Sequence, residues 1–209
     1  MGPEPRTFTT DDGFALEAEY AAPVGASRGA TVLCHPHPQY GGTMRSIVVS
    51  ALFGALPARG IACVRFNFRG VEGSEGSHSG GQEERRDAQA AVDTLASEVG
   101  AGVPLTLVGW SFGADVALSV LDQRLRGWVG IAPPLRFGNA VEAVAHDARP
   151  KLLVLAAHDE LRDPAEIQQE TAGWTSTRVE VVPGASHFFV GRTDRVVSAV
   201  GDFLELVMR

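Results

Sequence analysis

The segment 104–121 constrains the fold of this chain more than any other. Residues 104–108 form a short apolar run typical of a buried strand, and residues 114–121 keep apolar side chains at helical spacing. Between them lies Gly109-Trp-Ser-Phe-Gly113, so Ser111 stands between two glycines. A serine on so tight a turn adopts strained backbone angles, and the glycines remove collisions on either side. The pattern predicts a turn that lifts the Ser111 hydroxyl above a sheet, toward the start of the next helix.

Short apolar segments alternate with helical patterns along most of the chain. The other segments typical of strands cover residues 30–34, 61–66, 127–132, 151–156 and 177–182. The other expected helices cover residues 44–59, 82–99, 164–173 and 194–207. Residues 6–20 alternate apolar and polar side chains around Asp11-Asp12-Gly13, which predicts an antiparallel hairpin. We therefore expect one α/β domain, 1–209: a doubly wound, mostly parallel sheet of about seven or eight strands, helices on both faces and no lid.

A glycine-rich loop, 67–81, precedes the helix expected over 82–99. It lacks the Gly-Lys-Ser/Thr ending of a phosphate-binding loop, and Glu72 and Glu75 would repel phosphate. We interpret it as a rim loop with Arg69 in a structural ion pair. The helix that follows is expected to present a polar, charged face formed by Glu83, Glu84, Arg85, Arg86 and Asp87.

Three residues in separate loops have the types and order of a nucleophile, an acid and a base. Ser111 is followed by Asp159, after the strand 151–156, and by His187, after the strand 177–182. A serine nucleophile needs a base to take its proton and an acid to orient that base. In sheets of this kind loops after parallel strands meet at one edge. Glu160 and Asp163 remain alternatives for the acid, although Asp163 before a proline also suits a helix N-cap.

Acyl transfer also needs backbone N–H donors for the oxyanion. One donor is expected from Phe112, the residue after the nucleophile. The second is expected from the loop after the strand 30–34, where the two prolines have no N–H to offer. His37, Gln39 and Tyr40 remain as candidates, and we favour His37.

Neither a metal nor a cofactor is indicated. His35 and His37 are separated by one proline, but no third ligand lies at a suitable spacing, and the neighbouring prolines favour a loop-shaping role. No Gly-x-Gly-x-x-Gly follows the first parallel strand, which disfavours an oxidoreductase. We expect no metal site and no cofactor.

The charge balance bears on the kind of partner. The net charge is −7 and the isoelectric point about 5.3, which argues against nucleic acid or an anionic membrane as the main partner. No signal-peptide pattern and no run of 18 apolar residues occurs in the sequence. Cys34 and Cys63 lie in expected core strands and read as free thiols. We expect a cytoplasmic protein, and the sequence is compatible with a monomer or a homodimer.

Five motifs together resemble the α/β-hydrolase superfamily over residues 30–205, and more narrowly a branch of small, lidless hydrolases related to dienelactone hydrolases. They are His35-Pro-His-Pro-Gln-Tyr-Gly-Gly-Thr-Met44, Arg65-Phe-Asn-Phe-Arg-Gly-Val71 with Gly73-Ser74, Gly109-Trp-Ser-Phe-Gly113, Asp159-Glu160 and Pro183-Gly-Ala-Ser-His-Phe-Phe189. The resemblance implies a Ser–Asp–His triad without a cofactor. Ala156 departs from a glycine frequent in that branch, and a serine replaces the cysteine of dienelactone hydrolases proper, which puts dienelactones in doubt as substrates.

The sequence therefore predicts a serine hydrolase that cleaves small carboxylic esters through an acyl-enzyme on Ser111. The segment between residues 132 and 151, where larger relatives insert lids, is short, which favours short acyl chains or soluble substrates. Aromatic side chains near the motifs are candidates for the substrate pocket: Tyr40, Trp110 and Phe188, with Phe112, Phe137 and Phe189 as further possibilities. An amidase, thioesterase or acyltransferase using the same residues, or a non-catalytic ligand-binding protein, are the alternatives.

Overall fold

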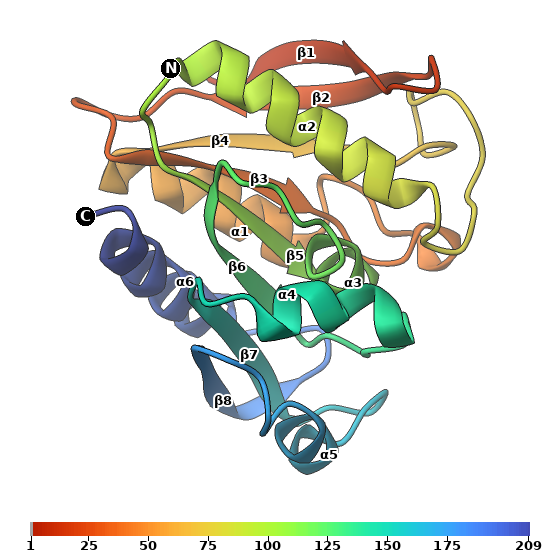
Figure 1. Cartoon of the computed structure of the whole chain (residues 1–209), viewed down its shortest axis with the longest axis vertical. Helices are drawn as coiled ribbons and strands as arrows, with labels where there is room; N and C mark the ends of the chain where they lie inside the picture. Colours follow the sequence, from red (N-terminus) through yellow and green to blue (C-terminus); the bar gives the residue numbers. More distant parts are fainter. Residues whose placement is uncertain (1) are drawn as a thin grey trace.

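The computed structural model describes residues 2–209, and the central feature of that range is an eight-stranded sheet (Figure 1). Its strands are β1 Glu4–Thr9, β2 Ala15–Ala21, β3 Gly29–Cys34, β4 Ile61–Phe66, β5 Leu105–Trp110, β6 Leu125–Ile131, β7 Lys151–His158 and β8 Thr177–Ser186. They lie in the order β1-β2-β4-β3-β5-β6-β7-β8. β1 and β2 form an antiparallel hairpin, and β2 is antiparallel to β4. All pairings from β4 to β8 are parallel, which confirms the predicted sheet with its N-terminal hairpin.

Helices cover both faces of this sheet, because a parallel sheet has two apolar faces to bury (Figure 1). The α-helices are α1 Ile47–Ala55, α2 Glu84–Val99, α3 Phe112–Ala117, α4 Glu142–His146, α5 Pro164–Glu170 and α6 Thr193–Val207, and the short 3₁₀ turns are η1 Pro38–Tyr40, η2 Leu56–Arg59 and η3 Gly138–Val141. α1 and α6 pack on one face, and α2 and α3 on the other. Within the described range, every helix falls short of what a bilayer-spanning helix requires.

Side chains alternate along each central strand between the two cores. On β5, Leu107 packs beneath α2 and α3, whereas Val108 packs toward α1 and α6, and both are buried. Burial of one such side chain contributes about 1.5–3 kcal/mol. A strand fixed in this way from both faces is a rigid support for the residues at its carboxyl end.

Several element ends differ from the predicted ones for local reasons. α1 begins at Ile47 rather than Met44, because Ser46 has extended backbone angles and forms the N-cap; the Met44 N–H donates to Asn67 Oδ1 at 2.8 Å. α3 ends at Ala117. Just beyond its end, the Ser119 hydroxyl donates a hydrogen bond to Val116 O, which competes with the continuation of the helix. β8 runs past Pro183 to Ser186, because an edge strand has no partner there for the missing N–H.

A buried arginine fastens the hairpin to α2. Arg69 is in the predicted structural ion pair: its guanidinium lies 2.7 Å from Asp87 Oδ1 and 2.9 Å from Asp12 Oδ2 in the hairpin turn. Glu84 and Asp87, which the sequence assigns to the polar, charged face of this helix, are both fully buried. Glu84 accepts hydrogen bonds from the Gly81 N–H and the hydroxyl of Ser79. The rim loop therefore folds back over the first turn of α2.

Candidate active site

The turn between β5 and α3 has the strained geometry that its sequence predicts. Ser111 has φ 54° and ψ −121°, outside the regions that non-glycine residues normally adopt. A Cβ on Gly109 would lie 2.0 Å from Gly113 O, and a Cβ on Gly113 would lie 2.4 Å from His35 O. Both glycines are therefore required by backbone atoms in fixed positions. The Ser111 N–H donates to Ile131 O at 2.8 Å, which joins the turn to the end of β6.

The three predicted catalytic side chains meet at the carboxyl edge of the sheet. Ser111 Oγ lies 2.9 Å from His187 Nε2, and His187 Nδ1 lies 2.8 Å from Asp159 Oδ2. Ser111 follows β5, Asp159 follows β7, and His187 follows β8, so three separate strands bring the chain of hydrogen bonds together. Ser111 and His187 are both buried, which strengthens these interactions by excluding water.

The Asp159 carboxyl is held in its ionised form. Burial opposes ionisation, but hydrogen bonds from His187 and from the backbone N–H groups of Leu161 and Arg162 outweigh it, so its pKa is lowered. With Nδ1–H directed at this carboxylate, Nε2 of the neutral ring is left to accept a proton from Ser111.

The two alternative acids have other partners. Asp163 caps α5, since its carboxylate accepts the Ala165 N–H at 2.8 Å. Glu160 Oε2 accepts the backbone N–H of His187 at 3.0 Å, so it holds the main chain of the histidine rather than its ring. Sequence reasoning missed this role, although the adjacent pair Asp159-Glu160 was the signal available. It also missed that Trp110 Nε1–H donates to His187 O at 3.2 Å.

The loop after β3 leaves one of the three predicted oxyanion donors available. The Gln39 N–H donates to His37 Nδ1 at 3.2 Å, and the Tyr40 N–H donates to His37 O at 3.1 Å. Among the residues that the structure describes, the backbone N–H groups of His37 and Phe112 donate to no protein acceptor. Phe112 opens α3, where the first N–H groups of a helix have no intrahelical partner.

His35 is a structural histidine in a fixed tautomer. Its Nδ1 lies 2.7 Å from Pro36 O, and its Nε2 accepts the Phe68 N–H at 3.0 Å. Burial lowers its pKa to about 4, so the ring is neutral at pH 7. It thereby joins the loop after β3 to the loop after β4. Residues 2–209 contain no group of three or more His, Cys, Asp or Glu side chains arranged to hold a metal ion.

Two connected cavities flank Ser111. The larger, about 480 Å³, lies beside His187 and is lined by the predicted pocket residues Tyr40, Trp110 and Phe188. The smaller, about 240 Å³, lies beside Phe112 and Phe137. We call the first the histidine lobe and the second the α3 lobe. The further candidate Phe189 is fully buried in the core and lines neither lobe.

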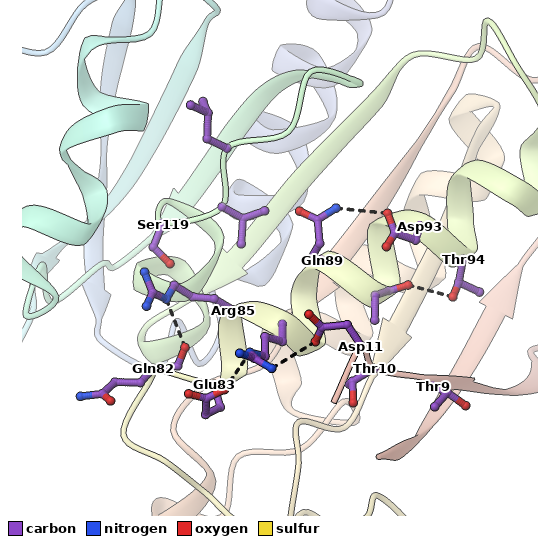
Figure 2. Close-up of a pocket in the computed structure, with 14 residues that line it drawn as sticks. Thr9, Thr10, Asp11, Gln82, Glu83, Arg85, Gln89, Asp93, Thr94 and Ser119 are labelled. Atoms are coloured by element: carbon purple, nitrogen blue, oxygen red, sulfur yellow. Dashed lines mark hydrogen bonds and ion pairs between the residues drawn. The ribbon is translucent and has the colours of Figure 1, made fainter. Parts of the chain in front are cut away.

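A larger cavity, about 620 Å³, lies away from Ser111 between the hairpin turn and α2 (Figure 2). Its polar side chains largely satisfy one another: Arg86 pairs with Asp11, and Gln89 donates to Asp93. Its lining includes Ser119, but no histidine that could activate that hydroxyl. This cavity therefore offers no chemistry comparable to that around Ser111.

Comparison with known proteins finds α/β serine hydrolases among the similar solved structures. No family model matches the chain. An α/β serine hydrolase homologue from Coxiella burnetii is 32% identical, with a TM-score of 0.87 and 98% of each chain covered. An α/β serine hydrolase without a lid from Xanthomonas campestris is 28% identical, with a TM-score of 0.86, and the match covers 97% of this chain and 93% of the other. Among curated proteins, an uncharacterized protein of Rickettsia prowazekii is 27% identical over 199 residues, 90% of this chain and 84% of the relative.

Proposed function

Because this chain belongs to the lidless α/β serine hydrolases, we propose that it hydrolyses carboxylic esters through an acyl-enzyme on Ser111. The observation that carries the proposal is the unbroken run of hydrogen bonds from Ser111 Oγ through both nitrogens of His187 to the Asp159 carboxylate. A serine hydroxyl is a weak nucleophile until a neighbouring base takes its proton, and this run supplies base and orienting acid.

The reaction follows from the positions of the atoms. His187 Nε2 takes the Ser111 proton as Oγ attacks the ester carbonyl, and the Phe112 and His37 N–H groups stabilise the oxyanion. Nε2–H then gives its proton to the leaving alcohol oxygen, and the C–O bond breaks to leave an acyl-serine. Water, deprotonated by His187, attacks the acyl carbonyl, and the proton returns to Ser111 as the carboxylic acid departs. The Asp159 carboxylate stabilises the charged ring in both steps.

The shape of the site favours small esters. The leaving alcohol receives its proton from His187 and therefore lies in the histidine lobe, so the acyl group occupies the smaller α3 lobe. The segment between β6 and β7 contains only the 3₁₀ turn η3 and the short helix α4, not a lid. We expect kcat/KM to fall from butyrate to palmitate esters of p-nitrophenol. A rise along that series would contradict the short-chain proposal.

The partner proposed here is a small-molecule ester in the cytoplasm. Support for the compartment comes from Cys34 and Cys63, which are free thiols buried in adjacent strands β3 and β4. Unpaired cysteines are typical of reducing compartments.

The direct test is intact-mass analysis after treatment with a fluorophosphonate. We expect one adduct on the wild type and none on Ser111→Ala. Ser119→Ala, which removes a hydroxyl bonded to Val116 O outside the site, is the matched control and should still be labelled. Asp159→Asn should label more slowly, by about 10³-fold or more, because the histidine tautomer is no longer held. A folded wild type that takes no label would contradict the proposal and favour a non-catalytic binding protein.

A further inference from the structure

Arg136 is a cation at the junction of the two lobes around Ser111. It lines both the histidine lobe and the α3 lobe, and it is exposed to solvent. Within residues 2–209, its guanidinium has neither a hydrogen bond nor an ion pair. Several other arginines, such as Arg69 and Arg149, are paired with carboxylates. The guanidinium of Arg136 therefore keeps all its donors free beside Ser111.

The backbone of Arg136 is hydrogen-bonded to α3, the helix that begins directly after Ser111. Asp115, one turn after Ser111 on α3, accepts the Leu135 N–H at 2.9 Å with Oδ1 and the Arg136 N–H at 2.7 Å with Oδ2. The Asp115 carboxylate is fully buried, so both of its oxygens are committed to these two bonds. The backbone of Arg136 therefore keeps a fixed position relative to Ser111, unlike that of a residue on a free surface loop.

The same loop has a strained main chain. Ala132 has φ 43° and Leu135 has φ 51°, and the residues between them are Pro133 and Pro134. Two positive φ angles on side-chain-bearing residues cost free energy that the surrounding contacts must offset, and such strain concentrates at functional sites. The two prolines and the Asp115 hydrogen bonds together restrict the main chain that carries Arg136.

The charges that face Arg136 leave it uncompensated. The histidine lobe contains no aspartate or glutamate in its lining, and the α3 lobe contains only Asp115. Burial raises the pKa of Asp115 to about 7, against the effect of its backbone hydrogen bonds, so a negative charge there is only partly developed at neutral pH. His37 faces both lobes, and burial, His78 and Arg136 lower its pKa. Apart from Asp115, the described lining of the two lobes therefore offers Arg136 no carboxylate.

We propose that Arg136 binds a carboxylate on the acyl group, so that the preferred substrates are monoesters of short dicarboxylic acids. We place the bound carboxylate on the acyl group rather than on the alcohol for one reason. The loop of Arg136 also contributes Pro134 and Phe137 to the α3 lobe, but it contributes no other residue to the histidine lobe. We infer that the bound anion is a carboxylate rather than a phosphate. A single planar guanidinium matches the two oxygens of a carboxylate, whereas one cation poorly neutralises a phosphate dianion. The inference rests on the function proposed above and assigns its substrate class.

Matched esters test this assignment. Hydrolysis of monoethyl glutarate and of ethyl pentanoate, followed by titration of the released acid, compares a charged acyl group with a neutral one of the same length. We expect the wild type to favour the glutarate ester in kcat/KM by about 10- to 100-fold, mainly through a lower KM, with the preference shrinking as salt is added. Arg136→Gln should reduce the ratio to near one, and Arg136→Lys should retain part of it.

Two controls separate charge in the cavity from charge elsewhere. Arg126→Gln removes an exposed arginine at the opposite end of β6 and should keep the wild-type ratio. The butanoate ester of glycolic acid, which carries its carboxylate on the alcohol side, should show no comparable dependence on Arg136.

The possible failures are distinguishable. A wild type that hydrolyses both ethyl esters equally well, or a ratio that Arg136→Gln does not change, would refute the role of Arg136 while leaving the esterase proposal intact. A dependence on Arg136 only for the glycolate ester would also refute it, because the anion would then lie on the alcohol side. Absence of hydrolysis of every ester, together with no fluorophosphonate adduct, would refute the esterase proposal itself.

Discussion

The backbone N–H of His187 donates to Glu160 Oε2 at 3.0 Å, so the neighbour of the proposed acid holds the main chain of the proposed base. On the other side of the same residue, Trp110 Nε1–H donates to His187 O at 3.2 Å. The peptide groups flanking the imidazole are therefore fixed from the loop after β7 and from the end of β5. The Asp159 carboxylate then orients the ring and, in the proposed reaction, stabilises its charged form.

Replacing Glu160 tests this arrangement. We expect Glu160→Ala to lower kcat by about 10-fold with little change in KM, because small displacements of a catalytic group are costly. Glu160→Gln keeps an oxygen acceptor and should recover most of the activity. Glu142→Ala removes an exposed glutamate in α4 and serves as the matched control. Equal losses for Glu160→Ala and Glu160→Gln would contradict a role through the acceptor atom.

The turn at Ser111 permits no side chain at Gly113. A Cβ there would lie 2.4 Å from His35 O and 2.5 Å from Cys34 O, both backbone atoms of the end of β3 and its loop. We expect Gly113→Ala to destabilise the protein by about 1–3 kcal/mol in urea unfolding and to reduce fluorophosphonate labelling. Gly54→Ala, in α1 with open space around its Cβ, should be neutral or stabilising by up to about 1 kcal/mol. Similar effects of the two substitutions would contradict this account.

The neutral state of His35 makes stability depend on pH. Burial lowers its pKa to about 4 from the ordinary 6.5, so below pH 6.5 the unfolded chain binds a proton that the folded protein does not. Its contribution is complete above pH 6.5 and is lost as the pH falls toward 4, by roughly 3 kcal/mol in all. His35→Gln keeps an acceptor for the Phe68 N–H but does not titrate. Urea unfolding at pH 7 and pH 5 should therefore show a smaller loss for the variant than for the wild type.

Asp115 has the opposite dependence. Burial raises its pKa to about 7 from 3.8, so between these values the folded protein retains a proton that the unfolded chain has lost. The stability contribution of this group is greatest below pH 4 and declines as the pH rises to about 7, by at most about 1.4 kcal/mol per pH unit. The difference in unfolding free energy between wild type and Asp115→Asn should shift in favour of the variant from pH 5 to pH 7. A difference independent of pH would show that Asp115 is ionised throughout.

The fold and the meeting of Ser111, Asp159 and His187 were predictable because their signals are local or depend only on chain order. The turn around Ser111 needs only its two glycines, and the loops of Asp159 and His187 follow strands whose carboxyl ends share an edge. The order of the strands was not predictable, since the pairing of β2 with β4 joins segments far apart in the chain.

The burial of charged side chains was not predicted from the sequence. Helical periodicity assigns Glu84 and Asp87 to a polar face, but their partners Ser79 and Arg69 belong to the rim loop. The path of that loop depends on contacts that periodicity does not contain. The role of Asp115 could not be predicted for the same reason, because the N–H groups that donate to it come from the loop after β6.

Asp115 binds the main chain of residues 135 and 136 and touches neither of their side chains in doing so. The path of the main chain at these two residues is therefore determined by a side chain of α3, outside the loop itself. The proposed contact of Arg136 with a carboxylate can therefore be altered by substitution at position 136 while the hydrogen bond that fixes its backbone stays in place.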